Sequence, residues 1–189
     1  PPQVILDGDA YGPQYGAPPV RSIDGIRWSR WTKTAAEGTG MLLEHCRRVK
    51  AALVMSTLTV YRPHDDPWHA SAEDDALGDQ KATHSAPYSV SKIAQEAVAR
   101  YCARSLDLPV VITRMGAAYG TNGGLPVMHL DDVAAGRPVQ TRWDPIPYSP
   151  IHDDDIAAFI EPLLDAAGTP ANIVNFCGDD AVSVQEWSA

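Results

Sequence analysis

A tyrosine and a lysine lie one helical turn apart at the start of a long helical pattern. Tyr88 and Lys92 stand in the segment YSVSK, so both side chains are expected to project from the same face of a helix. A cation held close to a phenol favours the phenolate and lowers the pKa of the tyrosine, which suits it to general acid or base chemistry. On spacing alone, however, an exposed tyrosine and lysine on a solvated helix face are the more common outcome.

Hydroxyl groups follow an apolar run upstream of this pair. The run Ala51 to Met55 is typical of a buried strand, and it continues into Ser56 and Thr57. These hydroxyls therefore fall at the carboxyl end of a predicted strand, where ligands bind in open α/β sheets. For Thr57 alone, a threonine satisfied by the local backbone is the simpler interpretation.

Helical and strand patterns alternate along the chain. The predicted pairs are Glu37 to Val49 with Ala51 to Met55, Val90 to Leu106 with Leu108 to Thr113, and Ile156 to Ala167 with Asn172 to Cys177. Met41, Leu42 and His45 share one stripe of the first helix, and Ile93, Ala94, Ala97, Val98 and Tyr101 share one face of the second. The alternation predicts an α/β fold with a Rossmann-like, doubly wound parallel sheet. Two stretches rich in Pro, Gly, His and Asp, 62–87 and 116–150, follow predicted strands and are expected to hold the substrate.

Composition limits the classes of partner. The chain has 189 residues, is 44% hydrophobic and carries a formal net charge of −9, which disfavours nucleic acid as a partner. Neither an apolar run of about 20 residues nor the layout of a signal peptide is present, so neither membrane insertion nor export is expected. Three cysteines cannot all pair and none lies in a C-x-x-C motif, which indicates buried thiols and a cytoplasmic location.

Several segments in order resemble the extended short-chain dehydrogenase/reductase superfamily, which includes NAD-dependent sugar-nucleotide epimerases and dehydratases. The matching segments are Glu37-Gly38-Thr39 with Leu42-Leu43, Ser56-Thr57 with Val60-Tyr61, Tyr88 with Lys92, Arg114 to Gly120, Ile151 to Ile156, and Val182 to Glu186. Together they cover the chain from Ala35 to Trp187. The last segment also reads as a helix-capping box. Five or more segments in the right order are a much stronger signal than any one of them.

The resemblance implies a role for each matching residue. Tyr88 would be the acid/base, Lys92 would lower its pKa and bind the nicotinamide ribose, and Thr57 would hydrogen-bond the reacting oxygen. The implied contacts to NAD or NADP are Ser56, Tyr88, Lys92 and Met115, and those to a small-molecule substrate are Thr57, Ala117, Arg142 and Tyr148. Residues 1–120 would then form an incomplete dinucleotide-binding core. Residues 121–189 would mainly bind substrate, with 151–177 returning a helix and a strand to the sheet.

The beginning of the chain departs from this pattern. No G-x-x-G-x-x-G or G-x-G-x-x-G motif occurs, and the early glycines, Gly8, Gly12 and Gly16, are spaced by four residues. A pyrophosphate-binding turn needs closely spaced glycines at a helix N-terminus. The first strand and helix units of the family are therefore missing, through truncation, through segments left out of this numbering, or through true loss. Val4 to Leu6 is the candidate for an early strand.

Other departures concern the substrate. Met115 stands where the family usually has Pro, and Ala117 and Tyr148 stand where many sugar-nucleotide enzymes have Asn and Arg. These changes weaken the case for a sugar nucleotide, although Arg137 and Arg142 could supply the charge instead.

Three other functions compete with that of an oxidoreductase. The groups His64-Asp65-Asp66 with His69, and His152 to Asp155, match no compact zinc pattern, so no functional metal is expected. A serine hydrolase is disfavoured because no G-x-S-x-G motif occurs. The serious rival is a non-catalytic Rossmann-fold binding or regulatory module that has lost the cofactor loop.

The resemblance also implies a homodimer, because family members commonly pair through the helix that carries Tyr88 and the helix before it. Leu43, Ala97 and Tyr101 on these two predicted helices are compatible with such a face.

Overall fold

The centre of the molecule is a four-stranded parallel sheet. The computed structural model describes residues 4–6, 33–78, 86–139, 141 and 144–189. Its sheet has the order β1-β2-β3-β8, with β1 at Val4–Leu6, β2 at Ala52–Thr57, β3 at Val110–Met115 and β8 at Asn172–Phe176. All three neighbouring pairs are parallel. The predicted strand at Val4–Leu6 is thus confirmed, and the other three begin and end within about two residues of their predicted bounds.

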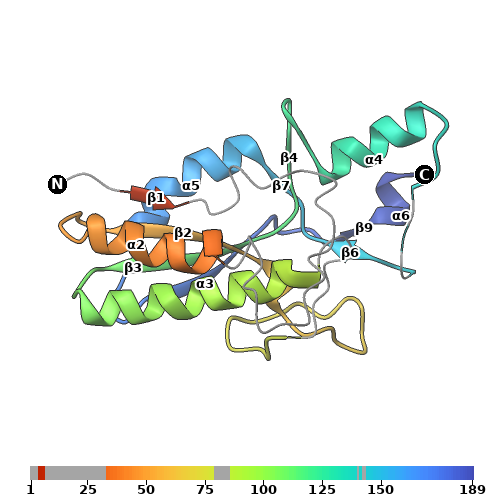
Figure 1. Cartoon of the computed structure of the whole chain (residues 1–189). Coiled ribbons are helices and arrows are strands. Elements are labelled where there is room, and N and C mark those ends of the chain that lie inside the picture. The colour runs from red at the N-terminus through yellow and green to blue at the C-terminus, as the bar shows by residue number, and fades with distance from the viewer. Residues whose placement is uncertain (1–3, 7–32, 79–85, 140, 142–143) are drawn as a thin grey trace.

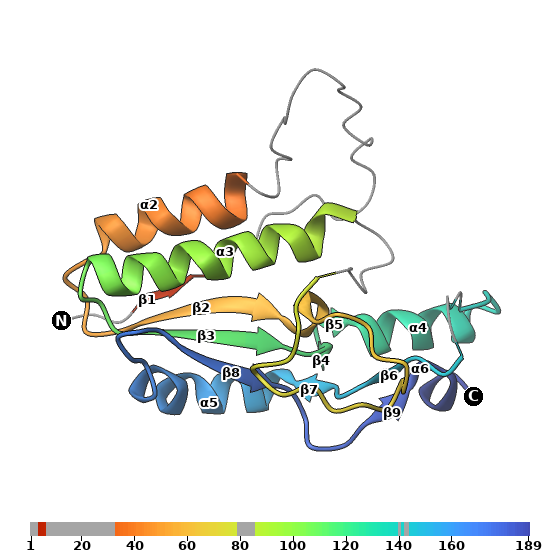
Figure 2. The ribbon, with the colours of Figure 1, turned by 90° about the horizontal axis from the view of Figure 1, so that it is seen from below.

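Helices cover both faces of this sheet, as Figure 2 shows. On one side lie α2, Gly38–His45, preceded by the π-helical turn Lys33–Glu37, and α3, Ala86–Ser105. On the other side lies α5, Asp153–Asp165, whose first turn carries three aspartates that suit the positive end of the helix dipole. The predicted α/β fold with a parallel, Rossmann-like sheet is confirmed. Among the described helices, none is both long and apolar enough to cross a bilayer.

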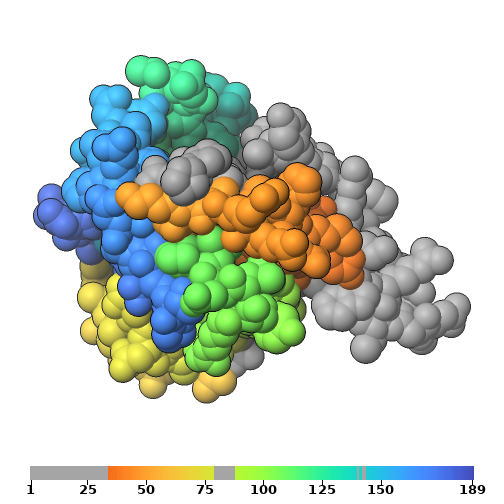
Figure 3. Space-filling view, turned by 90° about the vertical axis from the view of Figure 1, so that its left-hand side faces the viewer, coloured from red at the N-terminus to blue at the C-terminus, as the bar shows by residue number. Residues whose placement is uncertain are grey.

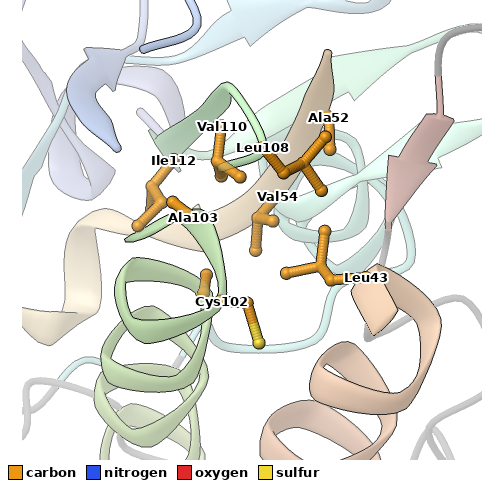
Figure 4. Close-up of a cluster of buried hydrophobic side chains, with 9 residues drawn as sticks. Leu43, Ala52, Val54, Cys102, Ala103, Leu108, Val110 and Ile112 are labelled. Atoms are coloured by element: carbon orange, nitrogen blue, oxygen red, sulfur yellow. The ribbon is translucent and has the colours of Figure 1, made fainter. Parts of the chain in front are cut away.

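Apolar side chains fill the space between the sheet and each helical layer. Under α2 and α3, the cluster in Figure 4 includes Leu43, Val54, Cys102, Val110 and Ile112. A second cluster lies under α5 and includes Leu53, Val111, Leu163 and Phe176. Alternate residues of β2 and β3 therefore point into opposite cores, which explains why both strands are apolar without interruption.

The two helices on the first face bury a different set of residues from the apolar stripes seen in the sequence. On α2, Met41 and Leu42 are 67% and 48% exposed, whereas Leu43 is fully buried. On α3, Tyr101 is 71% exposed. The buried residues of α3 are instead Ser89, Ser91, Lys92, Gln95, Glu96, Ala99, Cys102 and Ala103. Leu43 thus belongs to the core and cannot form part of an outer face. α2 and α3 lie side by side (Figures 1 and 2), and in Figure 3 the orange and green segments that contain them adjoin at the surface.

Short elements form a smaller part beyond the carboxyl ends of the strands (Figures 1 and 2). They are β4 (Ala118–Gly120), β5 (Gly123–Gly124), α4 (Leu125–Ala134), β6 (Pro147–Tyr148), β7 (Ile151–His152), β9 (Val182–Ser183) and α6 (Val184–Trp187). The predicted capping box is confirmed at α6, where Ser183 and Glu186 bond to each other's backbone N–H groups.

Candidate active site

The carboxyl ends of β2 and β3 lie next to each other in register. Ser56 is opposite Arg114, and Thr57 is opposite Met115. The next residue, Gly116, donates its N–H to the carbonyl of Phe176 at 2.8 Å, so the end of β8 joins the same edge. Three residues that the sequence assigned to the site, Ser56, Thr57 and Met115, are thus brought together by strand pairing.

Thr57 is largely buried and caps a short helical turn. Its hydroxyl oxygen accepts the N–H of Thr59 at 3.3 Å and lies 3.3 Å from the hydroxyl of that residue. This is the local backbone satisfaction that the sequence suggested as the simpler interpretation. A hydroxyl offers one hydrogen and two lone pairs, so capping is compatible with a further bond to a ligand.

Lys92 connects α3 to the end of β2. Its side chain is fully buried, and Nζ donates a hydrogen bond to the carbonyl of Met55 at 3.0 Å. The same Nζ lies 5.9 Å from the centroid of the Tyr88 ring, which is half-buried one helical turn earlier. The ammonium is therefore held between the phenol and the strand that ends in Thr57. A solvated, exposed pair is excluded.

Further hydrogen bonds fix the first turns of α3 against this edge. Ser89 donates to the Thr59 hydroxyl at 3.3 Å, and within the helix Ser91 donates back to the carbonyl of Tyr88 at 2.7 Å. The bonds from Ser89 and Lys92 hold the part of the helix that carries Tyr88 next to the turn that follows Thr57.

A buried ion pair lies directly behind these residues. Glu96 and Arg114 have side-chain exposures of 4% and 2%, and Arg114 Nη2 is 2.8 Å from Glu96 Oε2. Arg114 Nε also donates to Glu96 Oε1, at 3.0 Å, so the contact is bidentate. Burial alone would lower the pKa of Arg114, but its hydrogen bonds to Glu96 and Tyr61 raise it, so the guanidinium stays charged.

Sequence reasoning missed this pair, although two signals for it were present. Glu96 follows Lys92 by one helical turn and so continues the face that begins at Tyr88. Arg114 is a charged residue in a strand that is otherwise apolar and covered on both sides. A charge at such a position requires a partner, and the polar face of α3 was the place to look.

Of the other predicted substrate contacts, Tyr148 lies in the smaller part and Ala117 directly precedes it. Tyr148 is half-buried, and burial raises its pKa; its ring centroid is 5.7 Å from that of Trp187 on α6. Ala117 accepts the N–H of Ile151 at 3.0 Å through its carbonyl. Arg142 lies outside the described residues. Arg137 lines a hollow of about 430 Å³ between α4 and α6, but its guanidinium is paired with Asp132 at 2.7 Å.

One of the two ligand-rich groups in the sequence gathers in space. Possible ligand atoms of His152, Asp153 and Asp154 lie within 4.8 Å of one another. The cluster has a structural role, because His152 Nδ1 accepts the N–H of Asp154 and so caps α5.

Comparison with known proteins identifies the family. The sequence model of the NAD dependent epimerase/dehydratase family matches residues 27–135. The chain belongs to this family. A curated relative, the trifunctional UDP-glucose 4,6-dehydratase/UDP-4-keto-6-deoxy-D-glucose 3,5-epimerase/UDP-4-keto-L-rhamnose-reductase of Arabidopsis thaliana, is 34% identical over 98 residues. That match covers 49% of this chain and 14% of the relative.

Solved structures of the same kind share the fold. The UDP-glucuronic acid 4-epimerase of Bacillus cereus, in complex with UDP-glucuronic acid and NAD, has a TM-score of 0.68 at 21% identity, covering 89% of this chain and 53% of that one. The dTDP-glucose 4,6-dehydratase of Bacillus anthracis, in complex with NAD, has a TM-score of 0.67 at 20% identity, covering 82% and 50%. This chain from the epimerase/dehydratase family therefore spans about half the length of these structures.

Proposed function

We propose that this chain carries the acid/base centre of an NAD(P)-dependent epimerase, dehydratase or reductase, with Tyr88 as the acid/base. One observation carries the proposal. The buried Lys92 ammonium bonds the Met55 carbonyl at 3.0 Å and lies 5.9 Å from the Tyr88 ring centroid. A cation fixed in this way favours the phenolate, so Tyr88 can take a proton from a hydroxyl and return it to a carbonyl.

Three side chains share the work in this mechanism. Tyr88 moves the proton at the reacting oxygen of the substrate, and Lys92 stabilises the charge that Tyr88 carries after it gives up its own proton. Thr57 donates its hydroxyl hydrogen to the same substrate oxygen and so orients it. A nicotinamide cofactor would supply the accompanying chemistry, the acceptance or delivery of a hydride at the carbon that bears this oxygen.

The residues at the strand ends fit the nicotinamide end of such a cofactor. The Lys92 ammonium, held at the end of β2 by the Met55 carbonyl, would also bind a ribose hydroxyl of the cofactor. Ser56 and Met115 remain the proposed neighbours of the nicotinamide. The sequence has no glycine-rich turn for the pyrophosphate. We therefore assign to residues 1–120 only part of a site for NAD or NADP.

A sugar nucleotide is the proposed substrate class. The related proteins described above are named for UDP- or dTDP-sugars, and one of them was solved in complex with UDP-glucuronic acid. The proposed substrate-binding region is mainly residues 121–189, which hold most of the smaller part, and Tyr148 and Trp187 form an aromatic pair there. Thr57 and Ala117 would border the reacting sugar, and Arg142 would supply charge for phosphate.

We also propose a homodimer through α2 and α3. Their outer surface carries Met41, Leu42 and Tyr101, which are between 48% and 71% exposed. Exposed apolar side chains on two neighbouring helices favour association. Sedimentation equilibrium tests this proposal, and a monomer at micromolar concentration would refute it.

The test of the proposed activity pairs two tyrosines of the same helix. Tyr88→Phe removes the reactive hydroxyl, whereas Tyr101→Phe removes an exposed one. NADH and NADPH are titrated into wild type and both variants by nicotinamide fluorescence. Turnover of UDP-glucose, UDP-glucuronic acid and dTDP-glucose is then measured with the preferred cofactor. Tyr88→Phe is expected to lower kcat by about 10²- to 10⁴-fold with little change in cofactor Kd, and Tyr101→Phe to change neither.

The same experiment separates the enzyme from a binding module. A well-folded wild-type chain that binds neither dinucleotide, or a Tyr88→Phe variant with unchanged kcat, would reject the proposed mechanism. Saturable dinucleotide binding with no turnover of any sugar nucleotide would favour the cofactor-binding module instead.

A further inference from the structure

The ion pair between Glu96 and Arg114 connects more of the site than any other described contact. Besides its two bonds from Arg114, the Glu96 carboxylate accepts the hydroxyl of Ser56 at 2.5 Å. Arg114 uses its remaining nitrogen, Nη1, to bond the Tyr61 hydroxyl at 2.8 Å and the carbonyl of Glu73 at 2.9 Å. Both charges are therefore satisfied by groups in fixed positions.

On one side, this pair holds the end of β2 in position through Ser56. Ser56 stands between Met55, whose carbonyl holds Lys92, and Thr57, the proposed partner of the substrate oxygen. Its side chain is 2% exposed, and its hydroxyl hydrogen is committed to Glu96. Fixing Ser56 therefore fixes the carbonyl before it and the hydroxyl after it.

On the other side, the pair holds the loop that follows β2. The Tyr61 hydroxyl donates to Asn175 Oδ1 at 2.6 Å, and the Asn175 N–H donates to the Glu73 carboxylate at 2.8 Å. Asn175 Nδ2 also donates to the carbonyl of Ser71 at 2.7 Å. The segment 62–78, an expected substrate-binding stretch, is thereby tied to the end of β8 (Figure 2).

A buried ion pair is a poor device for stability alone, because the loss of hydration offsets much of the attraction between the charges. Its role here is to fix orientation. A bidentate contact holds the two side chains in one relative orientation, and this in turn fixes the positions of the groups that bond to them, such as the hydroxyls of Ser56 and Tyr61. We propose that Glu96 and Arg114 are positioning residues that align Thr57 and Lys92 for catalysis, acting through Ser56. This inference rests on the proposed function.

The test removes the connection without removing the charges. Ser56→Ala leaves the ion pair intact, and the matched control Thr39→Val removes another buried hydrogen bond to α3, the one from Gln95 to Thr39 at 3.0 Å. We expect Ser56→Ala to lower kcat by about 10-fold with the KM of the sugar nucleotide changed by less than about 3-fold, and Thr39→Val to lower kcat less than about 2-fold at similar loss of Tm.

A second variant tests whether Ser56 acts through the pair. Glu96→Gln keeps the shape of the side chain but removes its charge, and we expect kcat to fall by about 10-fold or more. In that background, Ser56→Ala should have no further effect on kcat, because the two residues act as one unit. Additive effects, or equal losses in Ser56→Ala and Thr39→Val, would overturn the inference. If Glu96→Gln does not fold, the comparison of Ser56→Ala with Thr39→Val decides alone.

Amide hydrogen exchange keeps this inference separate from the proposed function. If the wild-type chain shows no turnover, the proposed function fails, but the alignment can still be measured at residues 55–58. Ser56→Ala should speed amide exchange there by about 10-fold, and Thr39→Val should not. Unchanged exchange in Ser56→Ala would overturn the positioning role whatever the activity.

Discussion

The two halves of α3 face the same sheet but bury opposite kinds of side chain. The first half buries Lys92 and Glu96 and carries Tyr88 beside them, and the side chains of Lys92 and Glu96 bond to polar groups of β2 and β3. The second half buries Ala99, Cys102 and Ala103 against the apolar core shown in Figure 4. One continuous helix thus passes from a polar environment to an apolar one.

The difference follows from the direction of the parallel strands. Their carboxyl ends all reach the edge that the first half of α3 covers, and loops that can hold ligands begin there. Polar groups buried at that edge need partners of fixed geometry, whereas the apolar half needs only matching shapes. Substitutions in the first half should therefore change activity more than stability, and those in the second half should do the reverse.

The largest expected effect is in the polar half. Lys92→Met removes the ammonium but keeps an unbranched chain of similar length. We expect kcat to fall by about 10²- to 10³-fold, because the phenolate of Tyr88 loses its stabilising cation. Tm should change little, because the variant loses the hydrogen bond of the ammonium but also avoids the free-energy cost of removing a charged group from water on folding. Steady-state kinetics and thermal unfolding measure the two effects.

Lys50→Met is the matched control, because Lys50 is exposed and lies outside the helix. It should change neither quantity. A Lys92→Met variant that keeps more than about a third of wild-type kcat would remove the distinction between the two halves.

At the apolar half of α3, the expected effect of a substitution is on stability, and Leu43 of α2 tests it from the other side of the contact. Leu43 packs against Cys102 and Ala103, and Leu43→Ala should lower the free energy of unfolding by about 3 kcal/mol through the cavity it leaves. Urea denaturation measures this loss. Leu42→Ala, at a site 48% exposed, should cost less than about 0.5 kcal/mol. Equal losses at the two positions would contradict the burial of Leu43.

A helix outside both halves calibrates the comparison. α6 begins with the capping box in which Glu186 donates its N–H to Ser183 Oγ at 3.1 Å. Ser183→Ala should lower the free energy of unfolding by about 1 kcal/mol, as loss of a helix cap does elsewhere. A cost above that of Leu43→Ala would mean that the smaller part contributes more to stability than the core.

The smallest expected effect concerns pH and the apolar half. Burial, assisted by the charge of Glu44, raises the pKa of the Cys102 thiol above its ordinary value of 9.0. A pKa raised by folding gives a contribution to stability that is complete below the unfolded pKa and is lost as pH rises through the folded one. Urea denaturation from about pH 7 to pH 10 should therefore show a steeper decline for wild type than for Cys102→Ala. Parallel declines would show that this thiol does not titrate differently on folding.

Much of the helix and strand pattern could be predicted from the sequence, because local periodicity and β-branched runs depend on near neighbours. Strands β2, β3 and β8 lie within a few residues of their predicted bounds, and the spacing of Tyr88 and Lys92 indicated a shared face. The choice of face was harder. Met41 and Leu42 looked like an inward stripe, but the position of α2 against α3 is set by tertiary packing, which buries Leu43 instead.

The ion pair between Glu96 and Arg114 could not be predicted from near neighbours in the sequence, because it also depends on tertiary packing. Glu96 and Arg114 lie on different elements, and only the assembled sheet shows that they meet. Asn175 and Glu73 are separated by 102 residues, so their contact has no local sequence signal at all. Family patterns drew attention to Arg114 but said nothing of what it binds.

The contact between Tyr61 and Asn175 also sets an order of events during synthesis, because it joins residues 114 positions apart. A nascent chain that has emerged through β3 already contains Glu96 and Arg114, and it can form the ion pair. It does not yet contain Asn175, so the segment 62–78 has no anchor on β8. Contacts of such long range form late and slow the final step of folding. On the ribosome, β1, β2 and β3 can therefore pair before β8 is synthesised and segment 62–78 is anchored on it.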